Sequence, residues 1–241
     1  MIAAVVPAAG VGSRFVLTDN GRTKQFFKLL GRPTYIWSLS TLCAHELIDA
    51  VMLVLSTTTA CKQVQEEVES YLTKEQAQKV LYTTGGDTRQ ESVFCGLTAL
   101  ATRPQKPDYV LVHDAARPFL TQALVSCSIK AARESGAFTL GVPVTDTIKR
   151  IKDGVIQETL DRSDIYAIQT PQGGKFQWLL DAHLKAKQEN VSTTDDAAIL
   201  EYSGHKVIIV DGSGYNIKLT KQEDIRLCEA LAGLIETRES G

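Results

Sequence analysis

The segment Pro7–Arg14 combines small residues with a cation, a pattern that suits phosphate binding. It reads Pro-Ala-Ala-Gly-Val-Gly-Ser-Arg, directly follows an apolar run and is itself followed at some distance by Lys24. Small residues let backbone N–H groups close around phosphate oxygens, and Arg14 and Lys24 can supply positive charge. The glycines would equally serve a tight turn without a ligand. Because Phe15 stands where a dinucleotide fingerprint needs glycine, and no Gly-Lys-Ser/Thr follows at the Walker spacing, we expect a phosphate loop of another kind.

A second glycine-rich segment, Gly85–Ser92, also lies just beyond an apolar run and would open a helix. Its glycines allow a ligand to approach closely, and Asp87 or Ser92 could bind a sugar hydroxyl or a base edge. Asp87 could equally cap the helix that follows, by accepting hydrogen bonds from its first N–H groups. From this segment alone, capping is the expected role of Asp87.

A third segment, His113–Pro118, follows a very hydrophobic run and places Asp114 at the carboxyl end of a predicted strand. A carboxylate in that position could hold Mg²⁺, which takes oxygen ligands and keeps waters and substrate phosphates in its shell. The alternative is a buried Asp114–Arg117 pair that only organises the turn. His113 is expected to be a strand-end histidine with satisfied hydrogen bonds rather than a base.

All three segments follow apolar runs of strand length, and helical patterns lie between these runs. Apolar residues at i, i+4 and i+7, such as Val64, Val68 and Tyr71, mark the helices. Alternation of this kind through residue 142 predicts an α/β fold with a doubly wound, mostly parallel sheet. Ligands of such sheets bind beyond the carboxyl ends of the strands. The predicted strands are Ile2–Val6, Val51–Leu55, Val80–Thr83, Tyr109–His113, Phe138–Val142 and Lys206–Val210, and the later helices are Lys175–Gln188, Asp195–Tyr202 and Gln222 to about Ile235.

The alternation breaks from Val144 to Thr170, where apolar and charged residues alternate around Asp153-Gly154. That dipeptide between alternating runs is a hairpin signal. Because an isolated two-stranded hairpin is marginal in water, we expect a protruding β-arm at about residues 144–170 that packs on a second copy of the chain. The remaining sequence shows no linker, so residues 1–241 are predicted to form a single domain that carries this arm.

The composition narrows the function classes. Of 241 residues, 44% are apolar and 22% charged, as in globular proteins with a sizeable core, and the net charge of −2 predicts no general attraction to nucleic acid or to anionic membranes. The five scattered cysteines lack a Cys-x-x-Cys pair, which argues against zinc and a disulfide framework and favours a reducing compartment. No apolar run approaches the ~20 residues of a membrane span, and no basic leader precedes Ile2, so a cytoplasmic protein is expected.

Taken in order, the motifs resemble the 2-C-methyl-D-erythritol 4-phosphate cytidylyltransferase family over residues 2 to about 225. Each motif is weak by itself, and the ordered set is highly specific. Ala115-Ala116 is more similar to this family than to the related ribitol-5-phosphate cytidylyltransferases. The matching motifs are Ala8-Ala9-Gly10-x-Gly-x-Arg14, Lys24-Gln25, Gly85-Gly86-Asp87-x-Arg89-x-x-Ser92, His113-Asp-Ala-Ala-Arg-Pro118, Asp146-Thr147-x-Lys149-Arg150, Gln169-Thr-Pro-Gln172, Thr194-Asp195 and Asn216-Ile-Lys218-Leu-Thr220.

The resemblance implies a Rossmann-like nucleotidyltransferase fold, a homodimer that exchanges the β-arm, and use of CTP with Mg²⁺ or another divalent cation and a polyol phosphate. The charge and the short apolar runs predict no nucleic-acid or membrane partner. Arg14, Lys24 and Lys218 would then stabilise the triphosphate and the transition state, and Asp114 would bind the metal. Thr147 and Arg162 on the arm would hold the acceptor phosphate of the partner's site. The implied nucleotide-binding residues are Ala8, Ala9, Gly10, Gly86, Asp87, Ser92 and Ala115.

Two departures and several alternatives stay open. The loop Thr18–Arg22 is longer than usual in the family, and Tyr215 stands where relatives can carry a carboxylate near the metal, so a second protein ligand is doubtful; Asp211 could simply end its strand. Asp195 is expected to cap a helix. The alternative functions are transfer to ribitol 5-phosphate or another polyol phosphate, a nucleotide-binding module without turnover and, more distantly, a dehydrogenase.

Overall fold

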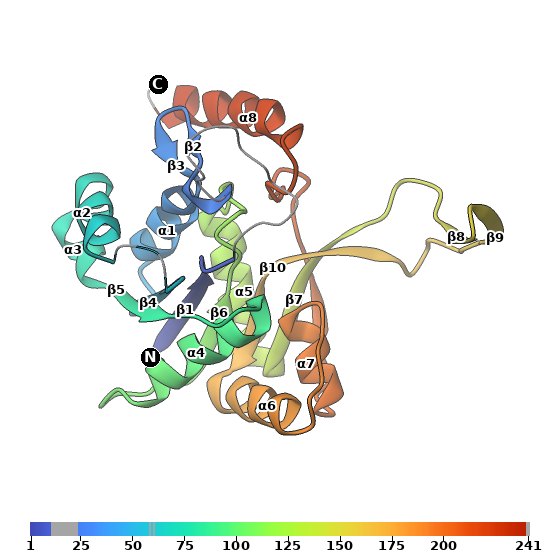
Figure 1. Ribbon diagram of the computed structural model, residues 1–241, viewed down its shortest axis with the longest axis horizontal. Helices are drawn as coiled ribbons and strands as arrows, with labels where there is room; N and C mark the ends of the chain where they lie inside the picture. The colour runs from blue at the N-terminus through green and yellow to red at the C-terminus, as the bar shows by residue number, and fades with distance from the viewer. Residues whose placement is uncertain (11–23, 58, 60, 240–241) are drawn as a thin grey trace.

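A computed structural model describes residues 1–10, 24–57, 59 and 61–239 and contains a seven-stranded central sheet (Figure 1). The strand order is β11-β7-β10-β6-β1-β4-β5. β1 lies parallel to β4 and β6, β5 is parallel to β4, and β11 is parallel to β7, which confirms the mostly parallel α/β fold. The strands are β1 (Ile2–Pro7), β4 (Ala50–Leu55), β5 (Val80–Thr84), β6 (Tyr109–Val112), β7 (Ala137–Pro143), β10 (Tyr166–Lys175) and β11 (Ile208–Asp211).

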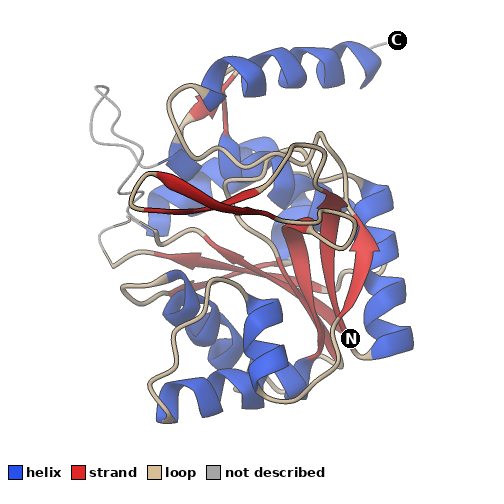
Figure 2. Cartoon of the chain, turned by 90° about the vertical axis from the view of Figure 1, so that its right-hand side faces the viewer, coloured by secondary structure: helices blue, strands red, loops and turns tan. Residues whose placement is uncertain are grey.

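Helices cover both faces of this sheet (Figure 2). Along β1, Ala4 and Val6 belong to one buried cluster and Ala3 and Val5 to another, because successive strand residues point to opposite faces. The first cluster includes residues of α1 (Thr34–Ala44), α2 (Cys61–Tyr71) and α5 (Gln122–Ser135), and the second includes residues of α4 (Arg89–Ala101), α6 (Phe176–Gln188) and α7 (Asp196–Tyr202). α3 (Lys74–Gln78) follows α2.

A smaller cluster lies beside this body, where α8 (Asp224–Glu239) packs against Leu29, Trp37, Phe119 and Leu219. Leu29 ends β2 (Lys28–Leu29), which pairs antiparallel with β3 (Arg32–Pro33), and the short helix η1 (Lys24–Phe26) precedes β2. None of the helices within the described ranges is long and apolar enough to cross a bilayer.

β10 is the exception to the parallel arrangement, because it runs antiparallel to both of its neighbours, β6 and β7. Two glycines make this position possible. A Cβ on Gly173, at φ +145°, would lie 2.1 Å from the carbonyl oxygen of Val110, and one on Gly174, at φ +153°, would lie 2.0 Å from that of Gly136. Only glycine tolerates these dihedrals together with so close an approach of two backbones.

The segment expected as an arm at 144–170 therefore divides in two. Its last residues, from Tyr166 onward, belong to β10 and pair with β7 in the central sheet, which corrects the predicted boundary. Residues 144–165, called the β-arm below, contain β8 (Lys149–Lys152) and β9 (Val155–Thr159), which pair as a hairpin that projects from the body (Figure 1). The predicted turn is confirmed, with Asp153 at φ 51° and Gly154 at φ 78°, as a two-residue hairpin turn of type I′ requires.

Candidate active site

The carboxyl ends of β1 and β6 and the start of α4 enclose a cavity of about 100 Å³. Sequence motifs that lie far apart in the chain meet there. Gly85 shows how closely they pack, because a Cβ on it would lie 2.6 Å from Ser92 Oγ and 2.9 Å from Ala9 Cβ. The lining residues are Pro7, Gly10, Gln25, Arg89, Ser92, Asp114, Ala115, Ala116 and Lys218.

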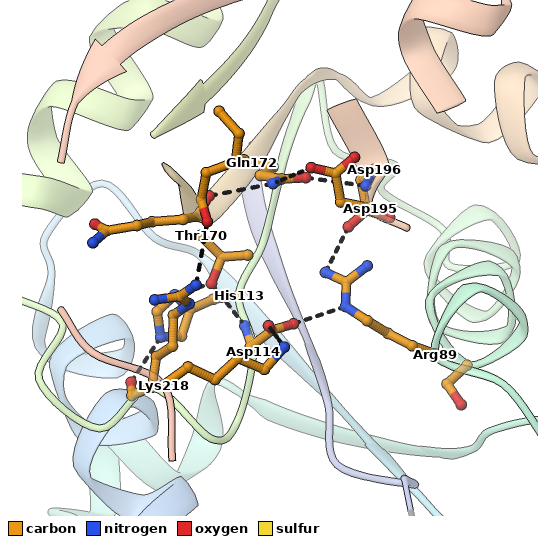
Figure 3. Close-up of polar contacts among 12 residues, drawn as sticks. Arg89, His113, Asp114, Thr170, Gln172, Asp195, Asp196 and Lys218 are labelled. Carbon is orange, nitrogen blue, oxygen red and sulfur yellow. Dashed lines mark hydrogen bonds and ion pairs between the residues drawn. The ribbon is translucent and has the colours of Figure 1, made fainter. Parts of the chain in front are cut away.

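The Asp114 carboxylate lies between two cations in this cavity (Figure 3). Arg89 Nε donates to Asp114 Oδ1 at 2.8 Å, and Lys218 Nζ donates to Asp114 Oδ2 at 2.5 Å. Burial alone would raise the pKa of Asp114, but the charges of Arg89 and Lys218 outweigh it and hold this pKa well below its usual range. The site therefore contains an ionised carboxylate held between two positive charges.

A buried hydrogen-bond chain fixes the backbone from which Asp114 extends. The Asp114 N–H donates to Thr170 Oγ1 at 3.1 Å, and Thr170 Oγ1 lies 3.2 Å from His113 Nδ1. His113 Nε2 lies 3.0 Å from the Arg117 carbonyl oxygen, which can only accept, so Nε2 carries the ring hydrogen and Nδ1 accepts from the Thr170 hydroxyl. Burial lowers the pKa of His113 to about 4, which confirms a neutral histidine with both nitrogens satisfied.

Arg117 does not form the alternative ion pair with Asp114. Its Nη1 donates to the Asn216 carbonyl oxygen at 2.6 Å and its Nη2 to the Ile168 carbonyl oxygen at 3.3 Å. The turn is closed instead by the Arg117 backbone N–H, which donates to the Asp114 carbonyl oxygen at 2.9 Å. The Arg117 side chain thus connects the Asp114 turn to the segment that carries Lys218.

The expectation that Asp87 caps α4 is wrong. Thr88 is the N-cap, and its hydroxyl accepts from the Glu91 N–H while the Glu91 carboxylate accepts from the Thr88 N–H. This reciprocal pair is a capping box, and the spacing Thr-x-x-Glu in the sequence was the signal for it. Asp87 therefore does not cap the helix. The Ser92 hydroxyl donates to the Thr88 carbonyl oxygen at 2.8 Å.

Gln25 organises the end of β1. Its Nε2 donates to the carbonyl oxygens of Ala8 and Gly10, both at 2.7 Å, and its side chain is buried. Because one side-chain amide binds both carbonyl oxygens, it fixes the turn after β1. Gly10 then lies at the cavity wall. The Lys24-Gln25 motif in the sequence included Gln25 but did not predict these hydrogen bonds.

The structure brings some of the predicted site residues together and places others apart. Asp114, Lys218, Ser92, Ala115 and Gly10 line the cavity. Thr147 and Arg162 are exposed on the β-arm, where Arg162 Nη1 donates to the Thr145 carbonyl oxygen. Arg14 and the loop Thr18–Arg22 lie outside the described residues, and of Lys24 only the backbone, at the start of η1, is described.

The contacts of Arg89 and Thr170 with Asp114 were missed, because the sequence does not show which residues their side chains meet. Asp195 caps α7 as expected, since its Oδ1 accepts from the Ala198 N–H at 3.0 Å. Asp211 ends β11, and Tyr215 is 69% exposed. Within the described ranges, no cluster of three or more His, Cys, Asp or Glu side chains could surround a metal ion. A cation in this cavity would therefore depend on Asp114 together with substrate and water oxygens.

Comparison with known proteins gives one consistent result. Residues 2–233 match the family model described as 2-C-methyl-D-erythritol 4-phosphate cytidylyltransferase (IspD). Proteins of that name from Clostridium novyi and Halalkalibacterium halodurans are 39% and 37% identical, over 97% of this chain and 97% and 98% of their own lengths. The structure of 4-diphosphocytidyl-2C-methyl-D-erythritol synthase from Anaerococcus prevotii is similar, with a TM-score of 0.81 at 30% identity over 96% of both chains.

Proposed function

This chain belongs to the 2-C-methyl-D-erythritol 4-phosphate cytidylyltransferase family, and on that basis we propose that its Asp114 cavity is the site of nucleotidyl transfer. The enzyme transfers CMP from CTP to 2-C-methyl-D-erythritol 4-phosphate and releases pyrophosphate. The product is 4-diphosphocytidyl-2-C-methyl-D-erythritol, an intermediate of isoprenoid biosynthesis. The observation that carries the assignment of the site is the Asp114 carboxylate between Arg89 and Lys218, at the carboxyl ends of the strands.

CTP would lie along the edge formed by the end of β1 and the start of α4. Ala8, Ala9 and Gly10 would line the nucleotide on one side, and Gly86, Asp87 and Ser92 on the other. Asp87 is free for this role because Thr88 caps the helix. Ala115 is small and buried at the cavity wall, so it leaves room for the ribose.

The reaction needs positive charge rather than a base. A phosphate monoester carries about −1.5 to −2 charges near neutral pH, so an oxygen of the acceptor phosphate is already a nucleophile. It attacks the α-phosphorus of CTP, a new P–O bond forms, and the bond to the β-phosphate oxygen breaks with its electron pair leaving on pyrophosphate. Lys218, with Arg14 and Lys24, would align the two anions and stabilise the charge on the phosphate oxygens.

Asp114 is the residue that would hold Mg²⁺ in this cavity. Its ionised carboxylate fits a hard cation, which when bound would neutralise charge on the triphosphate. Each carboxylate oxygen has two acceptor positions, so its bonds to Arg89 and Lys218 leave capacity for a ligand bond. Lys218 would shift from Asp114 toward the phosphates as the nucleotide enters.

The β-arm would complete the site of a second copy. Ile151 and Ile156 form a cross-strand pair on it and are 61% and 58% exposed, which is costly for an isolated hairpin. Pairing with a second copy would bury this surface and bring Thr147 and Arg162 to the partner's cavity, where they would bind the acceptor phosphate. The working unit is then a homodimer whose chains each form one domain with an arm.

Pyrophosphate release with CTP and Mg²⁺, assayed with each acceptor in turn, tests this assignment. We expect turnover with 2-C-methyl-D-erythritol 4-phosphate and much less with ribitol 5-phosphate. Turnover with ribitol 5-phosphate alone would assign the chain to the related reaction, and CTP binding without turnover on any acceptor would indicate a nucleotide-binding module. Loss of turnover in Asp114→Asn, with thermal unfolding unchanged, would support the cavity as the site.

A further inference from the structure

Arg89 bridges two carboxylates that come from different parts of the chain (Figure 3). Its Nε lies 2.8 Å from Asp114 Oδ1, and its Nη2 lies 2.8 Å from Asp196 Oδ2. The guanidinium is planar and presents its N–H groups in a fixed fork, so one carboxylate restricts where the other can lie. The position of the Asp114 carboxylate therefore depends on the position of the Asp196 carboxylate.

Asp196 is the buried end of this bridge. Its side chain is fully buried, and its Oδ1 lies 3.2 Å from His183 Nε2, which is itself buried. Its backbone N–H and that of Ala197 donate to Gln172 Oε1, both at 3.0 Å. The charge of Asp196 also lies in the first turn of α7, where the helix dipole favours an anion. Burial would raise the pKa of Asp196, but Arg89 and His183 keep it below its usual value, so the residue stays ionised.

A guanidinium beside a single carboxylate frequently adopts the bidentate arrangement, in which two N–H groups bond both oxygens. Around Asp114 that arrangement does not occur: Arg89 Nε donates to Asp114 Oδ1, while Arg89 Nη2 lies 2.8 Å from Asp196 Oδ2 in an ion pair that lacks hydrogen-bond geometry. Asp114 Oδ2 is consequently left to Lys218. Lys218 is one-third exposed at the cavity, so its ammonium can move toward an entering anion while Arg89 stays fixed.

We propose that Asp196 is a positioning residue for the metal step: it holds Arg89 away from the bidentate arrangement and so keeps Asp114 Oδ2 accessible to a divalent cation. This inference rests on the metal role of Asp114 proposed above. Without the Asp196 charge, Arg89 would turn onto both Asp114 oxygens and compete with the cation. Substitution of a residue that orients a metal ligand typically lowers metal affinity or activity about 10–100-fold.

The test is Asp196→Asn, which keeps the shape of the side chain and removes its charge. We expect the Mg²⁺ concentration for half-maximal turnover to rise about 10-fold or more, with the KM for the acceptor unchanged. A readout independent of turnover is Mn²⁺ binding, followed by electron paramagnetic resonance in the presence of CTP and without acceptor. Mn²⁺ affinity should fall by a similar factor.

Asp195→Asn is the matched control. Asp195 is the neighbouring carboxylate; it caps α7 and accepts from Gln172 Nε2 at 2.9 Å, whereas the ion pairs of Arg89 are with Asp114 and Asp196. The Asp195→Asn variant should have a lower free energy of unfolding, and its Mn²⁺ affinity should stay within about twofold of wild type. Arg89→Lys in the Asp196→Asn background is a rescue variant, because one ammonium cannot bond both Asp114 oxygens as the guanidinium fork does, and its Mn²⁺ affinity should return toward that of wild type.

Wild-type Mn²⁺ affinity in Asp196→Asn would overturn the positioning role, as would an equal loss in Asp195→Asn or a double variant that binds Mn²⁺ no better than Asp196→Asn does. Asp114→Asn separates this failure from that of the proposed function. If Asp114→Asn binds Mn²⁺ as well as wild type does, the metal role of Asp114 is wrong and the positioning role falls with it. If Asp114→Asn loses Mn²⁺ while Asp196→Asn keeps it, the metal site stands and only the positioning role is rejected.

Discussion

Lys218 Nζ lies 2.5 Å from Asp114 Oδ2, although 104 positions separate the two residues in the chain. In the free protein the lysine therefore neutralises the carboxylate proposed to hold the metal. A triphosphate that enters with its cation offers both residues new partners of opposite charge. Under the proposed function this ion pair is a resting arrangement, and its exchange for substrate contacts should couple nucleotide binding to metal binding.

The first prediction concerns Lys218 itself. Lys218→Ala should lower kcat by about 100-fold or more, as when one electrostatic stabiliser of a transition state is removed. Pyrophosphate release at saturating CTP measures the effect. Lys221→Ala is a suitable control, because Lys221 is an exposed lysine three positions away, and it should retain wild-type turnover. Near-normal turnover in a well-folded Lys218→Ala protein would remove this residue from the mechanism.

The second prediction concerns His113 and pH. Its folded-state pKa of about 4 lies below the ~6.5 of an unfolded histidine, so the unfolded chain binds a proton that the folded chain refuses in this range. The free energy of unfolding contributed by neutral His113 is fully present above pH ~6.5 and declines as the pH falls toward 4. The loss is roughly 3 kcal/mol at most for a shift of this size.

His113→Gln provides the comparison, because glutamine can donate to the Arg117 carbonyl oxygen and accept from Thr170 without titrating. Urea unfolding at pH 7.0 and at pH 4.5 should show a smaller loss for the variant than for wild type. Asp114 and Asp196 do not interfere, since their lowered pKa values place their effects below pH ~4. Equal losses in both proteins would show that His113 is accessible to protons in the folded state.

The third prediction concerns the β-arm. Replacing the exposed pair Ile151 and Ile156 by serine should convert a dimer to a monomer at micromolar concentration, because it removes the apolar surface that a partner would bury. Analytical ultracentrifugation measures the change, and turnover should fall with dimer content. Gln157→Ala alters an exposed neighbour on β9 and should leave the dimer intact. A monomeric wild-type protein with full activity would contradict the shared site.

The fourth prediction concerns the sheet. Gly174→Ala should lower the free energy of unfolding by about 3 kcal/mol or more, because its Cβ would lie 2.0 Å from the Gly136 carbonyl oxygen in the middle of the sheet. Gly204→Ala separates backbone strain from this clash, since Gly204 also has a positive φ, +84°, but open space around it. It should cost about 1–2 kcal/mol. Similar losses in both variants, measured by urea unfolding, would contradict the steric argument.

The parallel strands and most helices could be predicted, because buried runs such as Val51–Leu55 and periodic positions such as Val93 and Leu97 carry a local signal. β10 was missed as a sheet strand. Its sequence, Tyr-Ala-Ile-Gln-Thr-Pro-Gln-Gly-Gly-Lys, has neither alternation nor an apolar run, since its glycines serve the approach of neighbouring backbones. Local patterns do not report contacts of that kind.

For the candidate site, residue type at a strand end pointed to Asp114 and the ordered motifs pointed to Lys218; both line the cavity, and their roles stay predictions. The contacts of Arg89 were not predictable, because its partners Asp114 and Asp196 lie 25 and 107 positions away and only the fold brings them together. The capping error had a different cause. Asp87 and Thr88 are both good N-caps, and the Glu91 partner that distinguishes them was overlooked.

β10 also determines where the sequence can accept insertions and deletions. At one end the strand leaves the β-arm, whose tip at Asp153-Gly154 is exposed, and surface tips of this kind accept insertions. In its middle the strand carries Thr170, whose hydroxyl accepts from the Asp114 backbone N–H, and an added residue there would turn every following side chain to the opposite face. Insertions and deletions among homologous sequences should therefore occur at the hairpin tip and not between Gln169 and Gly174.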